Sequence, residues 1–149
     1  RSPIKEQSFL YRCLCIQPPI MNNSKLFILL VEDDKFIARA YKDGLEQSGF
    51  DVAIAVNGVE AMEQVQERVP RLILLDLIMP EKDGFEVLAE LKMDEDLKRI
   101  PVIILSNLGQ SVDIQKAKDL GAVDYLIKAD SSMQEVIEKV KIHIAKHMT

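Results

Sequence analysis

The sequence predicts an α/β domain in which a doubly wound, five-stranded parallel sheet is covered by five helices. Short apolar runs that suit buried strands alternate five times with longer segments whose apolar residues recur at helical spacing. These runs are almost continuously apolar rather than alternating, which is typical of a parallel sheet with both faces covered. The expected fold is therefore one sheet between two layers of helices.

The first strand and helix are expected between residue 25 and Gly49. The apolar run at 25–31 predicts the strand, Asp34 is expected to cap the helix that follows, and Gly49 can end that helix. The residues expected on the buried face of this helix are Phe36, Ile37, Ala40, Tyr41 and Leu45.

The second unit has its strand at 51–55. Asn57 and Glu60 have the spacing of a capping box, with Asn57 in the place of the usual Ser or Thr, so a helix is expected to begin there. The expected buried stripe of this second helix consists of Val59, Met62 and Val65.

Three more units complete the pattern. Their strands are expected at 72–75, 102–105 and 124–127, and their helices from Asp83 or Gly84 onward, at 111–120 and at 132–146. Gly121 can end the middle helix, and Ser132 with Glu135 has capping-box spacing before the last one. The residues expected to face the core are Phe85, Leu88 and Leu91 in the first of these helices and Val136, Ile137, Val140 and Ile144 in the last.

Length and composition limit the possible functions. The 149 residues, 48% hydrophobic and 29% charged, fit one globular domain with a substantial core. A net charge of −5 and scattered Lys and Arg residues argue against direct nucleic-acid binding. No apolar run approaches the roughly 20 residues that span a membrane. We expect a soluble, cytoplasmic protein that does not contact membranes and whose partners are proteins or phosphate donors.

Residues 1–22 differ from the rest of the chain. They show no persistent helical or strand period, and two consecutive prolines precede Met21. Cys13 and Cys15 lie in this segment without a nearby histidine or second pair, so neither a disulfide framework nor a zinc site is indicated. We expect an extension outside the core, either without fixed structure or added upstream of a natural start at Met21, and a single domain at 23–149.

Polar residues stand where the apolar strands end. Glu32 and Asp33 follow the first strand, Asp76 the third, Ser106 the fourth and Lys128 the fifth. Because the carboxyl ends of parallel strands open into one crevice, we expect these side chains to converge. Carboxylates, a hydroxyl and an ammonium in one crevice suit a metal-assisted aspartate that accepts a phosphoryl group.

The isolation of Asp76 supports this interpretation, because it is the only charged residue between Arg71 and Glu81. A carboxylate can accept a phosphoryl group when a cation screens its charge and donors bind the phosphoryl oxygens. Glu32 and Asp33 would repel each other without a divalent ion, and Mg²⁺ prefers such oxygen ligands. Ser106 and Lys128 could be the donors, although each alone could also be an ordinary surface residue.

The motifs at these positions resemble the receiver domain of two-component response regulators. They are VEDD at the end of the first strand, DLIMPEKDG after the third, LSN after the fourth and DYLIK in the fifth. The MP dipeptide followed two residues later by DG is the most specific of them. The resemblance runs from Lys25 to the last helix and implies the flavodoxin-like receiver fold.

The resemblance also implies a phosphorylation-activated signalling switch of a two-component phosphorelay. A sensor histidine kinase or a histidine phosphotransfer protein would donate a phosphoryl group to Asp76. Asp33, Asp76 and the backbone carbonyl of Ile78 would hold Mg²⁺, and Glu32 would act through a metal-bound water. Such a protein promotes its own phosphorylation and slow dephosphorylation but is not a turnover enzyme.

The resemblance further implies how the switch would act. Ser106 and Lys128 would bind the phosphoryl group, and Ser106 and Tyr125 would change position on activation, so that charge is converted into packing. The fourth helix, fifth strand and fifth helix would then present a face to a downstream protein. The expected state is a monomer or a phosphorylation-dependent dimer.

Two departures from the family pattern carry predictions. Ala129 follows Lys128 where the family usually has a proline after a cis bond; a cis bond before alanine costs about 3–4 kcal/mol, so we predict a trans peptide with a rearranged loop, or strain. Ile78 and Leu108 are apolar at positions where fast-hydrolysing members often carry polar groups. We therefore predict slow self-dephosphorylation.

Other functions fit the sequence less well. An aspartate-nucleophile phosphohydrolase generally needs a second carboxylate two residues after its nucleophile, where this chain has Ile78. A flavin-binding module would want Ser, Thr and Gly after the first strand rather than EDDKF. The alternative that stays open is a receiver-like interaction module that works without phosphorylation.

His143 and His147 are spaced one helical turn apart on the last predicted helix. Such a pair could bind a metal, but the sequence supplies no third ligand. We expect both side chains to be solvated.

Overall fold

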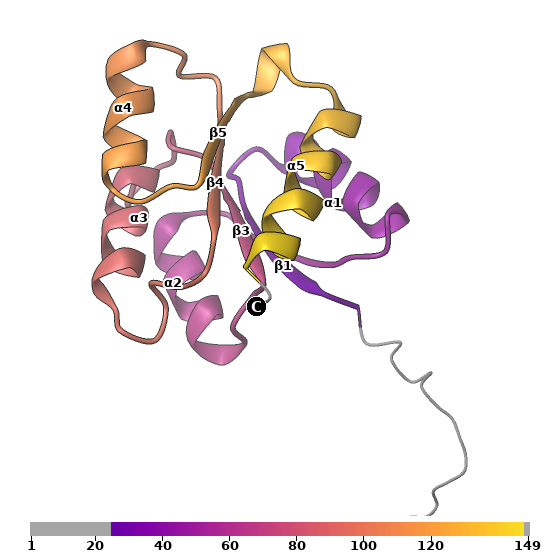
Figure 1. Cartoon of the computed structure of the whole chain (residues 1–149), viewed down its shortest axis with the longest axis horizontal. Coiled ribbons are helices and arrows are strands. Elements are labelled where there is room, and N and C mark those ends of the chain that lie inside the picture. The colour runs from indigo at the N-terminus through magenta and orange to yellow at the C-terminus, as the bar shows by residue number, and fades with distance from the viewer. Residues whose placement is uncertain (1–24, 148–149) are drawn as a thin grey trace, which may run out of the picture.

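The computed structural model describes residues 25–147 and confirms the predicted α/β class (Figure 1). One parallel sheet has the strand order β2-β1-β3-β4-β5. The strands are β1 (Phe27–Val31), β2 (Asp51–Ala55), β3 (Leu72–Leu75), β4 (Val102–Ser106) and β5 (Asp124–Ile127). The helices are α1 (Lys35–Gln47), α2 (Gly58–Glu67), α3 (Gly84–Met93), α4 (Ser111–Asp119), the short 3₁₀ helix η3 (Lys128–Asp130) and α5 (Met133–Lys146).

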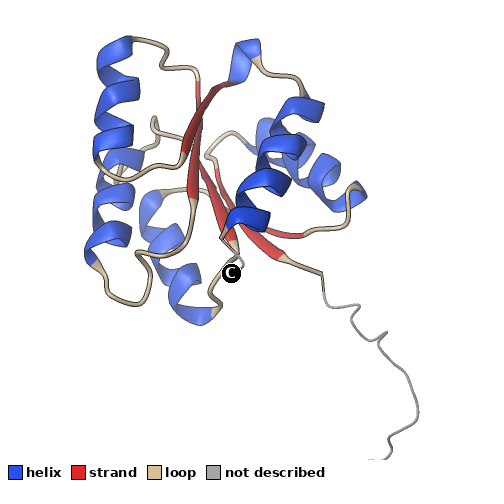
Figure 2. Cartoon of the chain, viewed as in Figure 1, coloured by secondary structure: helices blue, strands red, loops and turns tan. Residues whose placement is uncertain are grey.

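The sheet separates two layers of helices, as Figures 1 and 2 show. α1 and α5 cover one face, while α2, α3 and α4 cover the other. Successive strand residues point to opposite faces, so Leu29 and Val31 join one core and Ile28 and Leu30 join the other. Burial on both faces explains why the central strands are continuously apolar.

The strand order reverses between β1 and β3, and this reversal positions the site. β1 connects outward through α1 to β2, while β3, β4 and β5 follow on its other side. In such sheets a crevice opens at the carboxyl ends of the strands where the order reverses. The backbone ladder continues just past two strand ends, because Glu32 N–H donates to Ala55 O at 2.9 Å and Asp76 N–H donates to Val31 O at 3.0 Å.

The predicted buried faces of α1 and α2 are partly wrong. Phe36 is 88% exposed, and α1 buries Ala38 and Leu45 instead. In α2, Val59 is exposed and Ala61 is buried. In both helices the exposed residue precedes a buried alanine by two positions, which places it about 200° around the helix.

Ala40 is a further correction, because it is exposed on α1. Apolar residues occupy two faces of α1 and α2, so periodicity alone does not tell which face meets the sheet. The expected core residues of α5 are all buried, as are Leu88 and Leu91 of α3.

Side-chain caps mark where α1, α2 and α5 begin. Ser132 and Glu135 form the predicted capping box of α5. Asn57 accepts from Glu60 N–H at 2.8 Å, but the Glu60 carboxylate accepts from Val56 N–H, so the box predicted for α2 is only half formed. Asp34 caps α1 as predicted.

Two predictions concern the chain as a whole. Within residues 25–147, each helix is too short or too polar to cross a membrane. The predicted extension at 1–22, including Cys13 and Cys15, lies outside the described residues, so the division at residue 23 stays a prediction.

Candidate functional site

The predicted site residues lie together at the carboxyl edge of the sheet. Glu32 and Asp33 follow β1, Asp76 follows β3, Ser106 ends β4 and Lys128 follows β5. Glu32 is 2% exposed, Asp76 is 5% exposed and Ser106 is fully buried, whereas Asp33 is exposed. The site therefore has a buried floor with one carboxylate at its solvent side.

Lys128 joins two of the buried carboxylates. Its ammonium donates to Glu32 Oε1 and, at 3.2 Å, to Asp76 Oδ2. Burial disfavours the ammonium, but the bond to Glu32 and the charges of Asp76 and Glu32 outweigh it and raise the pKa of Lys128. Burial raises the pKa of Glu32. The hydrogen bonds from Lys128 and from Asp34 N–H lower this pKa, but they offset the effect of burial only in part. The ion pair is therefore maintained in a site that still disfavours negative charge.

The carboxylates of Glu32, Asp33 and Asp76 form a potential metal site. Each offers an oxygen, and these oxygens lie within 4.8 Å of one another. Among residues 25–147, Lys128 is the cation that pairs with carboxylates of this group, through Glu32 and Asp76, so negative charge is in excess there. Mg²⁺ takes one or two carboxylates together with waters, which suits this donor set.

Asp34 is not part of this cluster, although it directly follows Asp33. Its carboxylate accepts from Phe36 N–H at 2.9 Å and from Ile37 N–H at 3.1 Å, so it caps α1. The acidic pair that reaches the crevice is therefore Glu32 and Asp33.

The loop after Asp76 turns back against the site. Ile78 N–H lies 3.4 Å from Asp76 Oδ1, and the Ile78 side chain is 57% exposed. A Cβ on Gly84 would lie 2.2 Å from the carbonyl oxygen of Asp76. Only glycine fits there, which gives a packing reason for the glycine in DLIMPEKDG. The carbonyl of Ile78 stays a predicted ligand.

Ser106 and Tyr125 are linked through the loop that follows β4. Ser106 Oγ accepts from Leu108 N–H at 3.3 Å, and the Tyr125 hydroxyl donates to the Leu108 carbonyl. Burial raises the pKa of Tyr125, so its hydroxyl stays protonated and able to donate at neutral pH. The backbone N–H and the backbone carbonyl of Leu108 are therefore each bonded to a residue that is predicted to switch.

The segment after Lys128 takes the trans alternative of the prediction. Residues 25–147 contain no cis peptide bond, and Lys128–Asp130 form η3. Ala129 N–H donates to Asn107 Oδ1 at 3.0 Å. Asn107 was not among the predicted site residues. The available signal was the backbone N–H that alanine brings where the family usually has a proline, since this N–H can donate to a neighbouring side chain.

A second charged cluster lies near the start of β5. His143 Nε2 is 3.0 Å from Asp124 Oδ2, and Lys139 Nζ is 3.5 Å from the same oxygen. Burial would raise the pKa of Asp124, but the bonds from His143 and from Tyr125 N–H and the charge of Lys139 lower it overall.

The expectation that the two histidines are solvated is wrong for His143. That residue is 8% exposed, because α5 turns this position toward β5. His147 Nδ1 lies 2.8 Å from the His143 carbonyl oxygen, at the end of α5. Each ring therefore has its own protein partner, and the two do not form a metal site.

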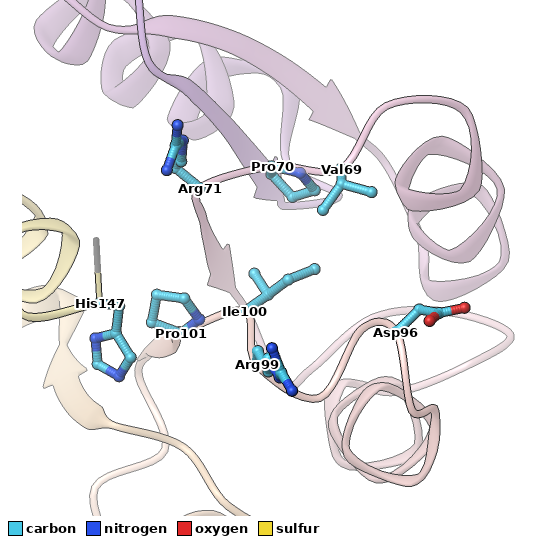
Figure 3. A pocket seen from close by; sticks show the side chains of 8 residues that line it. All are labelled: Val69, Pro70, Arg71, Asp96, Arg99, Ile100, Pro101 and His147. Atoms are coloured by element: carbon cyan, nitrogen blue, oxygen red, sulfur yellow. The ribbon is translucent and has the colours of Figure 1, made fainter. Parts of the chain in front are cut away.

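A hollow of about 360 Å³ lies at the opposite edge of the sheet from the acidic cluster. Val69, Pro70 and Arg71 precede β3 and line one side, and Arg99 lies in the segment before β4 (Figure 3). Arg71 and Arg99 extend in different directions rather than toward a common point (Figure 3). The hollow contains none of the predicted site residues.

Comparisons with known proteins agree with this geometry. The sequence profile of the response regulator receiver domain matches residues 28–141. The chain is 39% identical over 114 residues to the DNA-binding dual master transcriptional regulator RpaA of Synechocystis sp. (strain ATCC 27184 / PCC 6803 / Kazusa). That match covers 76% of this chain and 47% of RpaA, so the chain spans about half the length of this curated relative.

Solved structures of response regulators are also similar. The Mn²⁺-bound form of response regulator Rcp1 has 35% sequence identity and a TM-score of 0.73, covering 80% of this chain and 94% of that one. The phosphorylated cyanobacterial phytochrome response regulator RcpA has 36% identity and a TM-score of 0.69, covering 80% and 91%.

Proposed function

The chain belongs to the response regulator receiver domain family, and from this we propose that it is a phosphorylation-activated switch of two-component signalling. Asp76 would accept a phosphoryl group from a sensor histidine kinase or a histidine phosphotransfer protein. The observation that carries the proposal is a buried Asp76 that shares one ammonium with Glu32 in a cluster with excess negative charge. Such a cluster favours a bound cation and then an electrophilic phosphorus.

The transfer step uses the groups around Asp76. One of its carboxylate oxygens attacks the phosphorus of phosphohistidine, an O–P bond forms and the N–P bond breaks. The bonding electrons go to the imidazole nitrogen, which the donor's active site or water can protonate. Lys128 lies 3.2 Å from Asp76 Oδ2 and can follow the phosphoryl oxygens as negative charge moves onto them. Ser106 can donate its hydroxyl to another of these oxygens.

Mg²⁺ is the proposed cofactor. Asp33 and Asp76 would hold it together with the carbonyl of Ile78, and Glu32 would act through a bound water. The ion would screen the negative charge of the carboxylates and of the incoming phosphoryl group. The Mn²⁺-bound form of the relative Rcp1 supports a divalent ion in this family.

The switch would act through Leu108. A Ser106 hydroxyl that turns toward a phosphoryl oxygen alters its contact with Leu108 N–H, and the carbonyl of the same residue accepts from Tyr125. Movement of this loop would change the face made by α4, β5 and α5, where Val112 is an exposed apolar residue. This face is proposed to bind a downstream protein, with the chain as a monomer or a phosphorylation-dependent dimer.

The proposed lifetime of the phosphoryl group is long. The exposed side chain of Ile78 and the half-buried Leu108 are apolar, so neither can orient a water for attack on the phosphorus. Slow self-dephosphorylation follows from this composition.

Intact-mass spectrometry after incubation with Mg²⁺ and acetyl phosphate or phosphoramidate tests the proposal. We expect a single phosphoryl adduct that requires Mg²⁺, is absent from Asp76→Asn and persists in Asp130→Asn, which changes an exposed carboxylate nearby. Its decay measures the predicted lifetime, and rapid loss would contradict slow hydrolysis. No adduct from either donor would overturn the switch and favour the phosphorylation-independent interaction module.

A further inference from the structure

A hydrogen bond joins the two loops that flank the phosphoryl-binding residues. Ala129 N–H, directly after Lys128, donates to the side-chain oxygen of Asn107, directly after Ser106, at 3.0 Å. The two residues are 22 positions apart in the sequence, so the contact depends on the tertiary structure. A proline in place of Ala129 would have no N–H and could not make this bond.

The bond lies directly beyond the end of the β4–β5 ladder, whose last pair is Ser106 with Ile127. The Lys128 side chain is held by Glu32 and Asp76, and its residue is the first one after the last ladder pair. In η3 the chain turns toward α5, and the helix has no side-chain cap. The Asn107 side chain supplies an acceptor at this point.

We propose that Asn107 is a positioning residue that ties the Lys128 segment to the loop after β4 and thereby places the Lys128 ammonium for phosphoryl transfer. The inference rests on the proposed function. Where the family usually has a proline after the lysine, this chain has Ala129. The hydrogen bond from the Ala129 N–H to Asn107 would hold the Lys128 segment in place of a proline ring. Asn107 itself does not need to touch the phosphoryl group.

A double-mutant cycle on the full chain tests this role, with the phosphorylation rate read by intact mass at several acetyl phosphate concentrations. Asn107→Ala should lower the maximal rate about three- to tenfold, the effect of losing one net hydrogen bond. Ala129→Pro removes the donor, so Asn107→Ala should cause no further loss in that background. Gln110→Ala is the matched control, since Gln110 is an exposed amide in the same loop whose side chain makes no capping bond.

Backbone amide exchange by NMR tests the bond itself without any phosphoryl donor. The Ala129 amide should exchange with water several-fold faster in Asn107→Ala than in the wild type. Asn107→Asp keeps a side-chain oxygen acceptor and should restore slow exchange. Gln110→Ala should leave the Ala129 amide unchanged.

Three results would overturn the proposal. They are unchanged Ala129 exchange in Asn107→Ala, an unchanged maximal rate in that variant, and an equal loss from Asn107→Ala with and without the Ala129→Pro substitution. If the wild type forms no adduct, the proposed function fails, and with it the transfer role of Asn107. The exchange experiment would still decide whether the tie between the loops exists.

Discussion

The carboxyl edge of the sheet and the start of β5 each hold a carboxylate bonded to a basic side chain, but their charge balance differs. At the carboxyl edge, in the part of the chain that the structure describes, a group of three carboxylates pairs with the ammonium of Lys128 through two of its members, and the pKa of Glu32 is raised. At the start of β5, one carboxylate faces Lys139 and His143, and the pKa of Asp124 is lowered.

The contrast separates a cluster with excess negative charge from a cluster whose carboxylate is well compensated. The opposite pKa directions mean that the protein disfavours the charge of Glu32 and favours that of Asp124. A protein keeps buried, poorly compensated charge where chemistry needs it, and such groups concentrate at functional sites. The two clusters therefore differ in the direction of the pKa shift of one carboxylate in each, Glu32 and Asp124.

Removing the ammonium of Lys128 from the carboxyl edge is expected to have the greatest effect on stability. Lys128→Met leaves Glu32 and Asp76 buried without their cation, and we expect the free energy of unfolding to fall by about 3 kcal/mol at pH 7. Without the ammonium the pKa of Glu32 rises further, so protonation relieves the cost and the difference from wild type narrows toward pH 5. Urea denaturation at both pH values measures this.

Lys139→Met is the matched control for that substitution. Lys139 is nearly half exposed and lies 3.5 Å from Asp124, so its removal should cost about 0.5 kcal/mol or less. Equal losses from the two lysine substitutions would contradict the difference in charge balance.

A smaller change in the free energy of unfolding is expected when Mg²⁺ adds positive charge at the carboxyl edge. Mg²⁺ at roughly ten times its Kd should raise the free energy of unfolding of the wild type by about 1.4 kcal/mol. Asp33→Asn should lose this gain, and Asp124→Asn should keep it. Urea unfolding with MgCl₂ against NaCl of equal ionic strength checks the prediction, and a gain that persists in Asp33→Asn would place the ion elsewhere.

The least change in stability is expected in the cluster at the start of β5, from removing the charge of Asp124. A carboxyl group whose pKa is lowered in the fold contributes stability above its unfolded pKa, and that contribution is lost as the pH falls through the folded pKa. Asp124→Asn should therefore lower the free energy of unfolding by about 1 kcal/mol at pH 7, and the loss should shrink below about pH 4. Denaturation from pH 3 to 7 measures it. A loss independent of pH would mean that the charge of Asp124 contributes nothing.

The strands and the site positions were predictable because both depend on local patterns. β2, β3 and β5 begin and end at the predicted residues, and the apolar runs of β1, β3 and β4 reflect burial on both faces of the sheet. The site residues follow those runs directly, and parallel topology brings strand ends together. Phe36 and Val59 were misplaced because apolar side chains occur on two faces of their helices.

The order of elements, the parallel sheet and the set of groups that reach its carboxyl edge follow from the sequence alone, because hydrophobic periodicity and chain connectivity determine them. Which charges meet depends on the three-dimensional packing. Lys128 pairs with Glu32 and Asp76 across 96 and 52 positions, and His143 is buried against Asp124 across 19. Such pairings, and the pKa shifts that come with them, depend on how closely the elements pack and how much water they exclude, which local sequence does not encode.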